Sequence, residues 1–467
     1  MLEVFFLFTW LLIFIIIVFF TYKIRGYIKK YKAEENEQKV EKFQSMQNWF
    51  YTLIIIASFA GIGLVYLFLN GTIWESHFFE WLNLTVRWIH ITFGIAWIGA
   101  SFYFVFLENA LNRTKDVRDE LAGNLWAVHG GGFYYLEKYK VAPKKIPKDL
   151  HWFKYEAYFT WLSGFCLLII VYYFNAKSFL IDPEVLDISS EMAISISIVS
   201  LIIGWILYDQ MCKKLIKNKA IFTIAMTIFL VFFAWFYSQV FSGRGAFIHF
   251  GAMIGTLMAA NVFFVIIPGQ KRMVNAAKKG LEPNPEDGKA AFIRSYSNNY
   301  FTLPVLFIMI SNHFPSTFGN TYQWLVLLGI TIGSAGIKHY LNIREKGQLS
   351  IWVMPISVLL LLSIAFATAP VKPNYEDCKD AVTFEEITTI INNRCASCHS
   401  ANATDAVWKV APNGVKYDTP EQIYNFKDKI FQRVVVSKNM PFNNNQTQMT
   451  DEERDMINCW INQGAPK

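Results

Sequence analysis

The chain consists of long apolar runs separated by short polar connections. Ten runs have the length, or nearly the length, that a helix needs to cross ~30 Å of hydrocarbon. They lie at 2–22, 49–69, 82–107, 157–175, 192–211, 220–241, 246–268, 300–314, 322–341 and 351–370. The first run has no basic segment before it and no small-residue cleavage site after it, so we expect a retained anchor and not a signal peptide. The pattern predicts an all-α polytopic bundle of nine or ten spans over residues 1–370.

Basic side chains are unevenly divided between the two sets of connections. One set, at 23–48, 108–155, 212–219, 269–298 and 342–349, holds 28 Lys and Arg residues, whereas the other set holds only Lys177 and Arg244. Because basic loops remain on the cytoplasmic side, this asymmetry predicts that the N-terminus and everything after Pro370 lie outside. In a bacterial inner membrane that side is the periplasm, where cysteines can oxidise.

A second, smaller domain follows the last apolar run. Residues 371–376 (VKPNYE) have the proline and polarity of a linker, which leaves residues 377–467 as a soluble domain. Thr383 with Glu386 and Thr450 with Glu453 are capping boxes, and each predicts the start of a helix. We therefore expect a small all-α domain at the C-terminal end.

The soluble domain contains the motif Cys395-Ala-Ser-Cys-His399. Two cysteines with this spacing bind the vinyl groups of a c-type haem, and the histidine that follows is the proximal iron ligand. The alternatives are a zinc knuckle or a disulfide turn. A zinc site needs a second pair of ligands, and His399 is the only histidine after His339. Cys395, Cys398 and His399 are thus the predicted haem c ligands.

The sixth iron ligand is predicted at Met440, which lies in Lys438-Asn-Met-Pro-Phe442. A thioether ligand raises the potential of the iron, as suits an electron acceptor. Met449 and Met456 are the other candidates, and an ordinary buried methionine is the alternative for Met440. Cys378 and Cys459 flank the two predicted helices, which makes a disulfide between them plausible.

Composition supports the membrane assignment and excludes other classes. The chain is 54% hydrophobic and 17% aromatic, with only 17% charged residues. Its net charge of +7 does not indicate nucleic-acid binding, because the Lys and Arg residues lie in short loops. No G-x-G-x-x-G follows a predicted strand, so a nicotinamide or flavin Rossmann site has no support.

Several ionisable residues lie within the apolar runs, where charge is costly and usually functional. Arg87 and His90 are one helical turn apart, and His249 and His313 fall near the outer ends of their spans. These residues are predicted to share one outer pocket. The alternative for His249 and His313 is an interfacial histidine with an ordinary hydrogen bond.

A second group of polar residues lies on the predicted inner side. His129 opens His-Gly-Gly-Gly132, whose glycines permit a close backbone approach to a ligand or simply form a turn. Lys154 and Glu156 begin the next span. Two kinds of redox site fit the membrane histidines: a haem b held by facing helices, or a pocket where His and Arg handle the proton and charge of an oxidisable anion.

Five segments resemble the bacterial membrane-bound urate oxidases. They are Val86-Arg-Trp-Ile-His-Ile-Thr-Phe-Gly-Ile-Ala-Trp-Ile-Gly-Ala-Ser-Phe-Tyr103, Leu125-Trp-Ala-Val-His-Gly-Gly-Gly-Phe133, Lys154-Tyr-Glu-Ala-Tyr-Phe-Thr-Trp-Leu-Ser-Gly164, Asn298-Asn-Tyr-Phe-Thr-Leu-Pro-Val305 and Ser311-Asn-His-Phe-Pro315. Members join a multi-span urate-oxidising domain to a C-terminal cytochrome c, and the resemblance covers nearly the whole chain. It implies oxidation of urate to 5-hydroxyisourate, with electrons leaving through the cytochrome to a downstream cytochrome c or terminal oxidase and without direct formation of hydrogen peroxide.

Two other functions stay open from the residues alone. One is oxidation of quinol or another small molecule by cytochrome c, and the other is a membrane-tethered electron carrier. The position of the urate site is also open, since ~30 Å of membrane is too far for one electron step. We favour an outer pocket near His90 and His249 over an inner site connected by a second redox centre.

Overall fold

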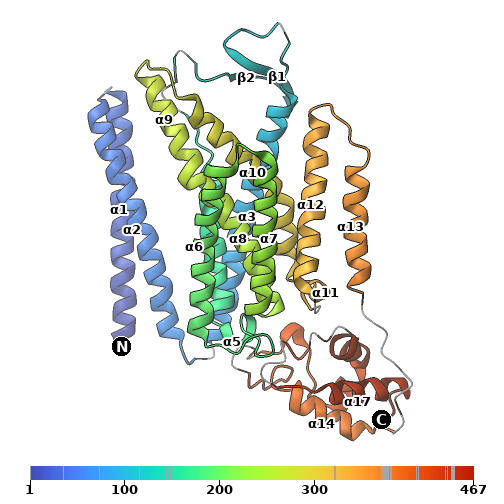
Figure 1. Ribbon diagram of the computed structural model, residues 1–467. Helices are drawn as coiled ribbons and strands as arrows, with labels where there is room; N and C mark the ends of the chain where they lie inside the picture. Colours follow the sequence, from blue (N-terminus) through green and yellow to red (C-terminus); the bar gives the residue numbers. More distant parts are fainter. Residues whose placement is uncertain are drawn as a thin grey trace. The chain divides into compact units, whose positions relative to one another are not determined.

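The computed structural model describes residues 2–34, 36–72, 74–114, 116–143, 145–147, 150–319, 322–369, 378, 381–405, 408, 410–436, 438, 440–442 and 447–467. The linker expected at 371–376 lies outside these described residues. Contacts between Cα atoms divide the chain into two compact units, 1–84 and 85–467, and each is described by itself. Both units are mostly helical, as expected from the apolar pattern (Figure 1).

The first unit is a pair of antiparallel helices, α1 (Leu2–Ala33) and α2 (Glu37–Leu69). The Trp10 indole donates a hydrogen bond of 2.6 Å to a backbone carbonyl of α2. It also lies so close to Gly61 that a Cβ there would come within 2.1 Å of the ring. A glycine is therefore needed where the two helices meet. The next helix, α3 (Trp74–Ala110), begins in this unit and continues into the second.

The second unit holds the remaining long helices. Up to residue 369 its helices and turns are α4 (Tyr155–Leu167), η1 (Leu168–Tyr173), α5 (Ala176–Phe179), α6 (Ser190–Leu215), α7 (Lys219–Val240), α8 (Gly243–Ala260), η2 (Asn261–Ile266), α9 (Ile267–Lys278), α10 (Pro285–Ser311), α11 (Pro315–Phe318), α12 (Gln323–Glu345) and α13 (Val353–Ala367). The segments η1 and η2 are π-helical turns that continue α4 and α8.

Eight of the helices in the described part of the chain are long and apolar enough to cross a membrane. The runs at 300–314 and 351–370 are not among them, although both are helical. The first is the C-terminal part of α10, whose earlier turns are polar, and the second is the 15-residue α13. The helices are those of a multi-pass membrane protein.

The core of the second unit lies around α8, which packs against α6, α7 and α10. Phe250, Met253 and Leu257 of α8 are fully buried. Gly204 of α6 permits the close approach, because a Cβ at this position would lie 2.3 Å from the Met253 side chain. This packing fixes the position of the polar residues that α8 also carries.

A β-hairpin between α3 and α4 is the one exception to the helical prediction among the described residues. Strand β1 (Leu121–His129) pairs antiparallel with β2 (Gly132–Tyr139). Gly130 and Gly131 join the strands with φ angles of 57° and 80°, in the left-handed region that glycine adopts easily. The glycines after His129 therefore have a structural role in this turn.

The C-terminal domain is a small helical domain, as predicted. It contains α14 (Phe384–Arg394), η3 (Pro412–Gly414), α15 (Pro420–Asn425), α16 (Lys427–Ile430), η4 (Phe431–Val436) and α17 (Asp451–Asn462). The capping boxes at Thr383 and Thr450 are both present. Ile387, Ile457 and Trp460 are fully buried and form the centre of the domain's own hydrophobic core.

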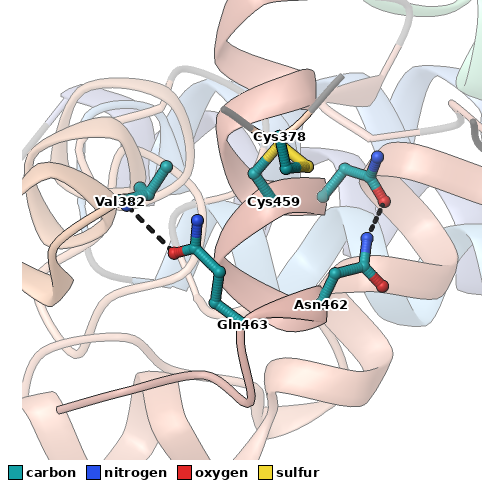
Figure 2. The surroundings of a disulfide bond; sticks show 6 residues. Cys378, Val382, Cys459, Asn462 and Gln463 are labelled. Atoms are coloured by element: carbon teal, nitrogen blue, oxygen red, sulfur yellow. Dashed lines mark hydrogen bonds between the residues drawn. A yellow bond between two sulfur atoms is a disulfide. The ribbon is translucent and has the colours of Figure 1, made fainter. Parts of the chain in front are cut away.

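A disulfide joins the start of the C-terminal domain to its last helix. Cys378 and Cys459 are bonded, with their Cα atoms 5.3 Å apart, which confirms the pairing expected from the sequence (Figure 2). The Gln463 side chain accepts a hydrogen bond of 3.0 Å from the backbone N–H of Val382 beside it. The two contacts fasten the first residues of the domain to α17.

Replacing both Cys378 and Cys459 by serine is expected to destabilise the C-terminal domain by about 3 kcal/mol, because the disulfide closes a long loop in the unfolded chain. Urea unfolding followed through the circular dichroism of the bound haem measures the effect. Unfolding at unchanged urea concentrations would contradict it. Haem content should stay the same, since neither cysteine belongs to the haem motif.

Candidate functional site

The haem motif lies directly after α14. Cys395 caps that helix, and Cys395 and Cys398 both have free thiols. The Nδ1 of His399 lies 3.1 Å from the backbone oxygen of Val415, so this nitrogen is the donor and Nε2 is left for a metal. Burial lowers the pKa of His399 and so favours the neutral imidazole that binds iron, although the bond to Val415 acts in the opposite direction. The residues fit a covalent haem c.

Met440 lies at a firmly held position in the same domain. Its backbone N–H donates to the Arg433 carbonyl at 3.1 Å, and its own carbonyl accepts a hydrogen bond of 2.8 Å from Arg454. The side chain packs against the domain's hydrophobic core. Met449 is buried in that core and Met456 lies on α17. Met440 stays the predicted sixth ligand.

Two arginines lie together in the membrane part of the second unit. Arg87 of α3 is within electrostatic range of Arg244 of α8 and of Tyr172 in η1. The Tyr172 hydroxyl donates to Asn312 at 3.2 Å. We call Arg87, Arg244, Tyr172 and Asn312 the arginine cluster.

Arg244 lies among aromatic rings. Its guanidinium lies 5.0 Å from the Phe179 ring centroid and 6.0 Å from that of Tyr172. Its Nε is buried without a hydrogen-bond partner, and no carboxylate of the described residues forms an ion pair with it. Among the described residues Arg244 therefore has no carboxylate beside it, and Arg87 adds a second positive charge nearby. Such a site is suitable for an anion.

The predicted outer histidines have different surroundings. The Nδ1 of His90 lies 3.0 Å from the Thr160 carbonyl and 3.2 Å from the Ser163 hydroxyl, both on α4. Its Nε2 has no hydrogen bond to any residue within the described ranges, and the ring is within electrostatic range of Arg87. His313 is exposed. His90 therefore has a nitrogen available close to the arginine cluster.

His249 is fully buried, with both ring nitrogens engaged. Nδ1 lies 2.7 Å from the Gly245 carbonyl, and Nε2 lies 2.6 Å from the Ser197 hydroxyl. The ring packs against Phe241 at 4.4 Å and touches Tyr172 edge-on at 6.2 Å. His249 thus packs against Tyr172. Because both of its ring nitrogens are hydrogen-bonded, neither is available to ligate a haem b.

The residues predicted on the inner side do not join this cluster. His129 is exposed at the hairpin. Lys154 is the N-cap residue of α4, with Nζ 4.8 Å from the Tyr155 ring. Glu156 lies two residues after it and has a buried Oε2 without a hydrogen-bond partner. The arginine cluster and His90 lie toward the other end of α4, next to η1. The predicted site residues therefore form two separate groups.

A cavity of about 650 Å³ lies at the hairpin end of the helices. Trp97, His151, Tyr296 and Asn298 are among its lining residues, whereas His129, Lys154 and Glu156 are not. Its size is that of a small-molecule pocket. The described part of the chain thus offers two candidate regions, a mostly apolar cavity and the arginine cluster, and of these two the arginine cluster contains adjacent cations.

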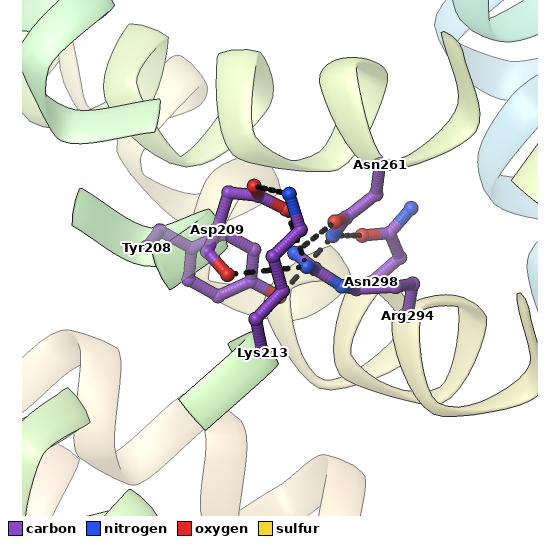
Figure 3. Close-up of polar contacts among 6 residues, drawn as sticks. All are labelled: Tyr208, Asp209, Lys213, Asn261, Arg294 and Asn298. Carbon is purple, nitrogen blue, oxygen red and sulfur yellow. Dashed lines mark hydrogen bonds and ion pairs between the residues drawn. The ribbon is translucent and has the colours of Figure 1, made fainter. Parts of the chain in front are cut away.

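Beside the cavity lies a buried polar network that sequence reasoning missed (Figure 3). Arg294 of α10 pairs with Asp209 of α6 at 2.6 Å and donates to Asn261 of η2 at 3.0 Å. Asn261 in turn donates to the Asn298 side chain at 2.8 Å. The sequence pattern places Arg294 in a basic connection, and the one signal for a helix is its position one turn before Asn298.

Comparison with protein families assigns both parts of the chain. The family described as urate oxidase N-terminal matches residues 76–369, and the cytochrome c family matches residues 384–465. No curated protein and no solved structure matches the chain. The first match covers more than half of the chain. The second contains the Cys395–His399 motif, so the C-terminal domain is a cytochrome c that carries covalent haem c.

Proposed function

Because the chain belongs to the urate oxidase N-terminal family and ends in a cytochrome c domain, we propose that it oxidises urate and delivers the electrons to its own haem c. The product is 5-hydroxyisourate, and hydrogen peroxide is not formed at the urate site. The chain is thus a cytochrome c-linked urate oxidoreductase. Its haem is reoxidised by a downstream cytochrome c or a terminal oxidase.

The arginine cluster is the observation that supports a site for urate. Urate is a planar anion, and a guanidinium can bind such an anion through two parallel hydrogen bonds. Arg244 has a buried Nε without a partner, and Arg87 adds a second positive charge beside it. The Tyr172 hydroxyl lies next to both and contributes a polar edge. Bound urate, which carries one negative charge, would balance the charge of Arg244.

The chemistry assigned to the chain's own residues follows from this placement. One water supplies the hydroxyl oxygen, while two electrons and two protons leave the substrate. Arg87 and Arg244 hold the anion and stabilise the negative charge that develops as it is deprotonated. His90 accepts a proton at Nε2, because Nδ1 is held by Thr160. A haem c held by Cys395, Cys398 and His399 would supply a one-electron outlet, so each urate would need two successive electron transfers.

The proposal sets the cytochrome c domain in the bacterial periplasm and the helices in the inner membrane. Loop charge supports this orientation, because only Lys177 and Arg244 lie in the connections on that side. Phe442 of the C-terminal domain contacts Arg244, so the domain meets the end of the bundle that has few basic residues. With the urate site at this end, no haem b is needed to cross the membrane.

Anaerobic addition of urate to purified membranes tests the function directly. The proposal expects the absorption bands of ferrous haem to appear, with two haems reduced for each urate consumed. Quinol analogues should not reduce the haem under the same conditions. Reduction by quinol and not by urate would replace this function with quinol–cytochrome c oxidoreduction.

Replacement of His90 by alanine is expected to slow urate-dependent haem reduction about a thousandfold, because a general base contributes 10²–10⁴ in rate. Stopped-flow spectroscopy of the purified protein measures this rate. His313→Ala is the matched control, since His313 is exposed and should leave the rate unchanged. Retained activity in the His90 variant, with haem c attached as usual, would exclude His90 as the base.

A further inference from the structure

Two aromatic side chains of the cytochrome c domain contact the membrane part of the second unit. The ring centroid of Phe442 lies 5.1 Å from that of Phe179 in α5, and the Trp408 centroid lies 6.0 Å from it. Phe179 is only 6% exposed. The guanidinium of Arg244 lies 5.6 Å from the Phe442 ring. Phe442 therefore touches a member of the arginine cluster directly.

Phe442 lies close to the predicted iron ligand in the sequence of the cytochrome c domain. Only Pro441 separates it from Met440, the predicted iron ligand. Arg454 holds the Met440 carbonyl at 2.8 Å and is itself within electrostatic range of Glu184, between α5 and α6. A short segment with a fixed backbone thus runs from the arginine cluster to the Met440 side of the haem site.

We infer that Phe442 and Trp408 form the docking face through which the cytochrome c domain receives electrons. The Phe442 ring would also cover Arg244 of the arginine cluster. The direction of electron flow rests on the proposed function, whereas the docking itself does not. The face is small and aromatic, as in the limited interfaces of weak electron-transfer complexes. It can therefore release the cytochrome c domain after each electron has been transferred.

Photo-crosslinking in the full-length holoprotein tests the docking without any substrate. The probe is p-benzoylphenylalanine in place of Phe442, with the same residue in place of Phe384 as a control. Phe384 packs on Trp460 inside the cytochrome c domain. We expect the probe at 442 to crosslink to the segment around Phe179 or Arg244, and the control to crosslink only within its own domain. Crosslinks at 442 that stay within the cytochrome c domain, or go to lipid alone, would overturn the docking face.

A second measurement tests the electron route. Phe442→Ala and Phe179→Ala should each slow urate-dependent haem reduction roughly tenfold, since an aromatic pair is worth up to about that factor in an equilibrium constant. Reduction by ascorbate should not change, and Phe442→Trp should restore the rate. The double variant should be slowed by less than the product of the two single effects, because both variants remove the contact between Phe442 and Phe179.

The possible failures are distinguishable. If crosslinks form as expected but urate does not reduce the haem of the unmodified protein, the proposed function fails and the docking face stands. If urate reduces the haem and Phe442→Ala reacts as fast as the unmodified protein, the electron route is wrong while the function stands.

Discussion

Replacing Arg244 by alanine is expected to lower the rate of urate-dependent haem reduction at low urate concentration roughly a hundredfold, because loss of one partner from a buried charge contact costs 2–5 kcal/mol. The reason is specific to this position. Arg244 has a buried Nε without a partner and no carboxylate of the described residues to balance it, so bound urate would be its counter-ion. The rate as a function of urate concentration, recorded by stopped-flow spectroscopy, measures the effect.

Two matched variants separate a binding role from a general charge effect. Arg244→Lys keeps the charge but loses the planar fork of donors, so part of the loss should remain. Lys177→Ala removes the other basic residue of the poorly charged set of connections, on α5, and should change the rate little. Equal losses in the Lys177 and Arg244 variants would mean that the arginine acts only through overall charge.

Replacing Asp209 by asparagine is expected to destabilise the membrane part by about 4 kcal/mol, because it leaves a buried guanidinium unpaired. The Arg294 side chain is only 5% exposed and forms a 2.6 Å pair with Asp209. The exposed Lys213 also binds this carboxylate at 2.6 Å but can turn into solvent when it is lost. The melting temperature in detergent, followed by tryptophan fluorescence, should fall by several degrees.

Replacing Arg294 and replacing Asp209 should destabilise the protein by different amounts. Arg294→Met removes the buried cation and leaves Asp209 paired with Lys213, so it should cost less than Asp209→Asn. Lys213→Ala should cost no more than about 1 kcal/mol, because one partner of that pair is exposed. A larger loss for Arg294→Met would show that the hydrogen bond to Asn261, and not charge balance, holds α6 and η2 together.

The apolar pattern predicted most helices but not their ends. The run at 246–268 stops at Pro268, whereas the helix continues through η2 and α9 to Lys278. Pro268 is tolerated because it lies in the first turn of α9, directly after the π-helical turn, where a missing N–H does little harm. Hydropathy does not predict a π-helical turn, because such a turn differs from an α-helix in its hydrogen bonds and not in its composition.

The polar half of α10 was missed for a related reason. Residues before Tyr300 read as part of a basic connection, yet Arg294 and Asn298 are buried in the helix. Their partners Asp209 and Asn261 are remote in sequence and adjacent only in the fold. A sequence pattern contains only the local neighbours of a charged residue. An arginine whose partner is distant in sequence is therefore predicted to be exposed to solvent.

The haem attachment motif can be recognised from the sequence because it is local, whereas the sixth ligand, Met440, stays a prediction. The Cys395–His399 motif lies inside the cytochrome c match. Of the two arginines in the cluster, the sequence predicts only Arg87, because it lies in an apolar run. Arg244 stands out only as a rare basic residue in its set of connections. That rarity was a usable signal, since a cation that departs from the charge asymmetry needs a local reason.

The disulfide between Cys378 and Cys459 also limits the distance between the last described residue of the membrane part and the cytochrome c domain. Because Cys378 is fastened to α17, nine peptide bonds separate this fixed point from Ala369, and nine residues span at most ~32 Å. A covalent connection of this length would give the inferred docking face an effective concentration in the millimolar range at its contact site around Phe179. A contact made by only two aromatic side chains would therefore suffice for docking, since the cytochrome c domain cannot diffuse away from the helices.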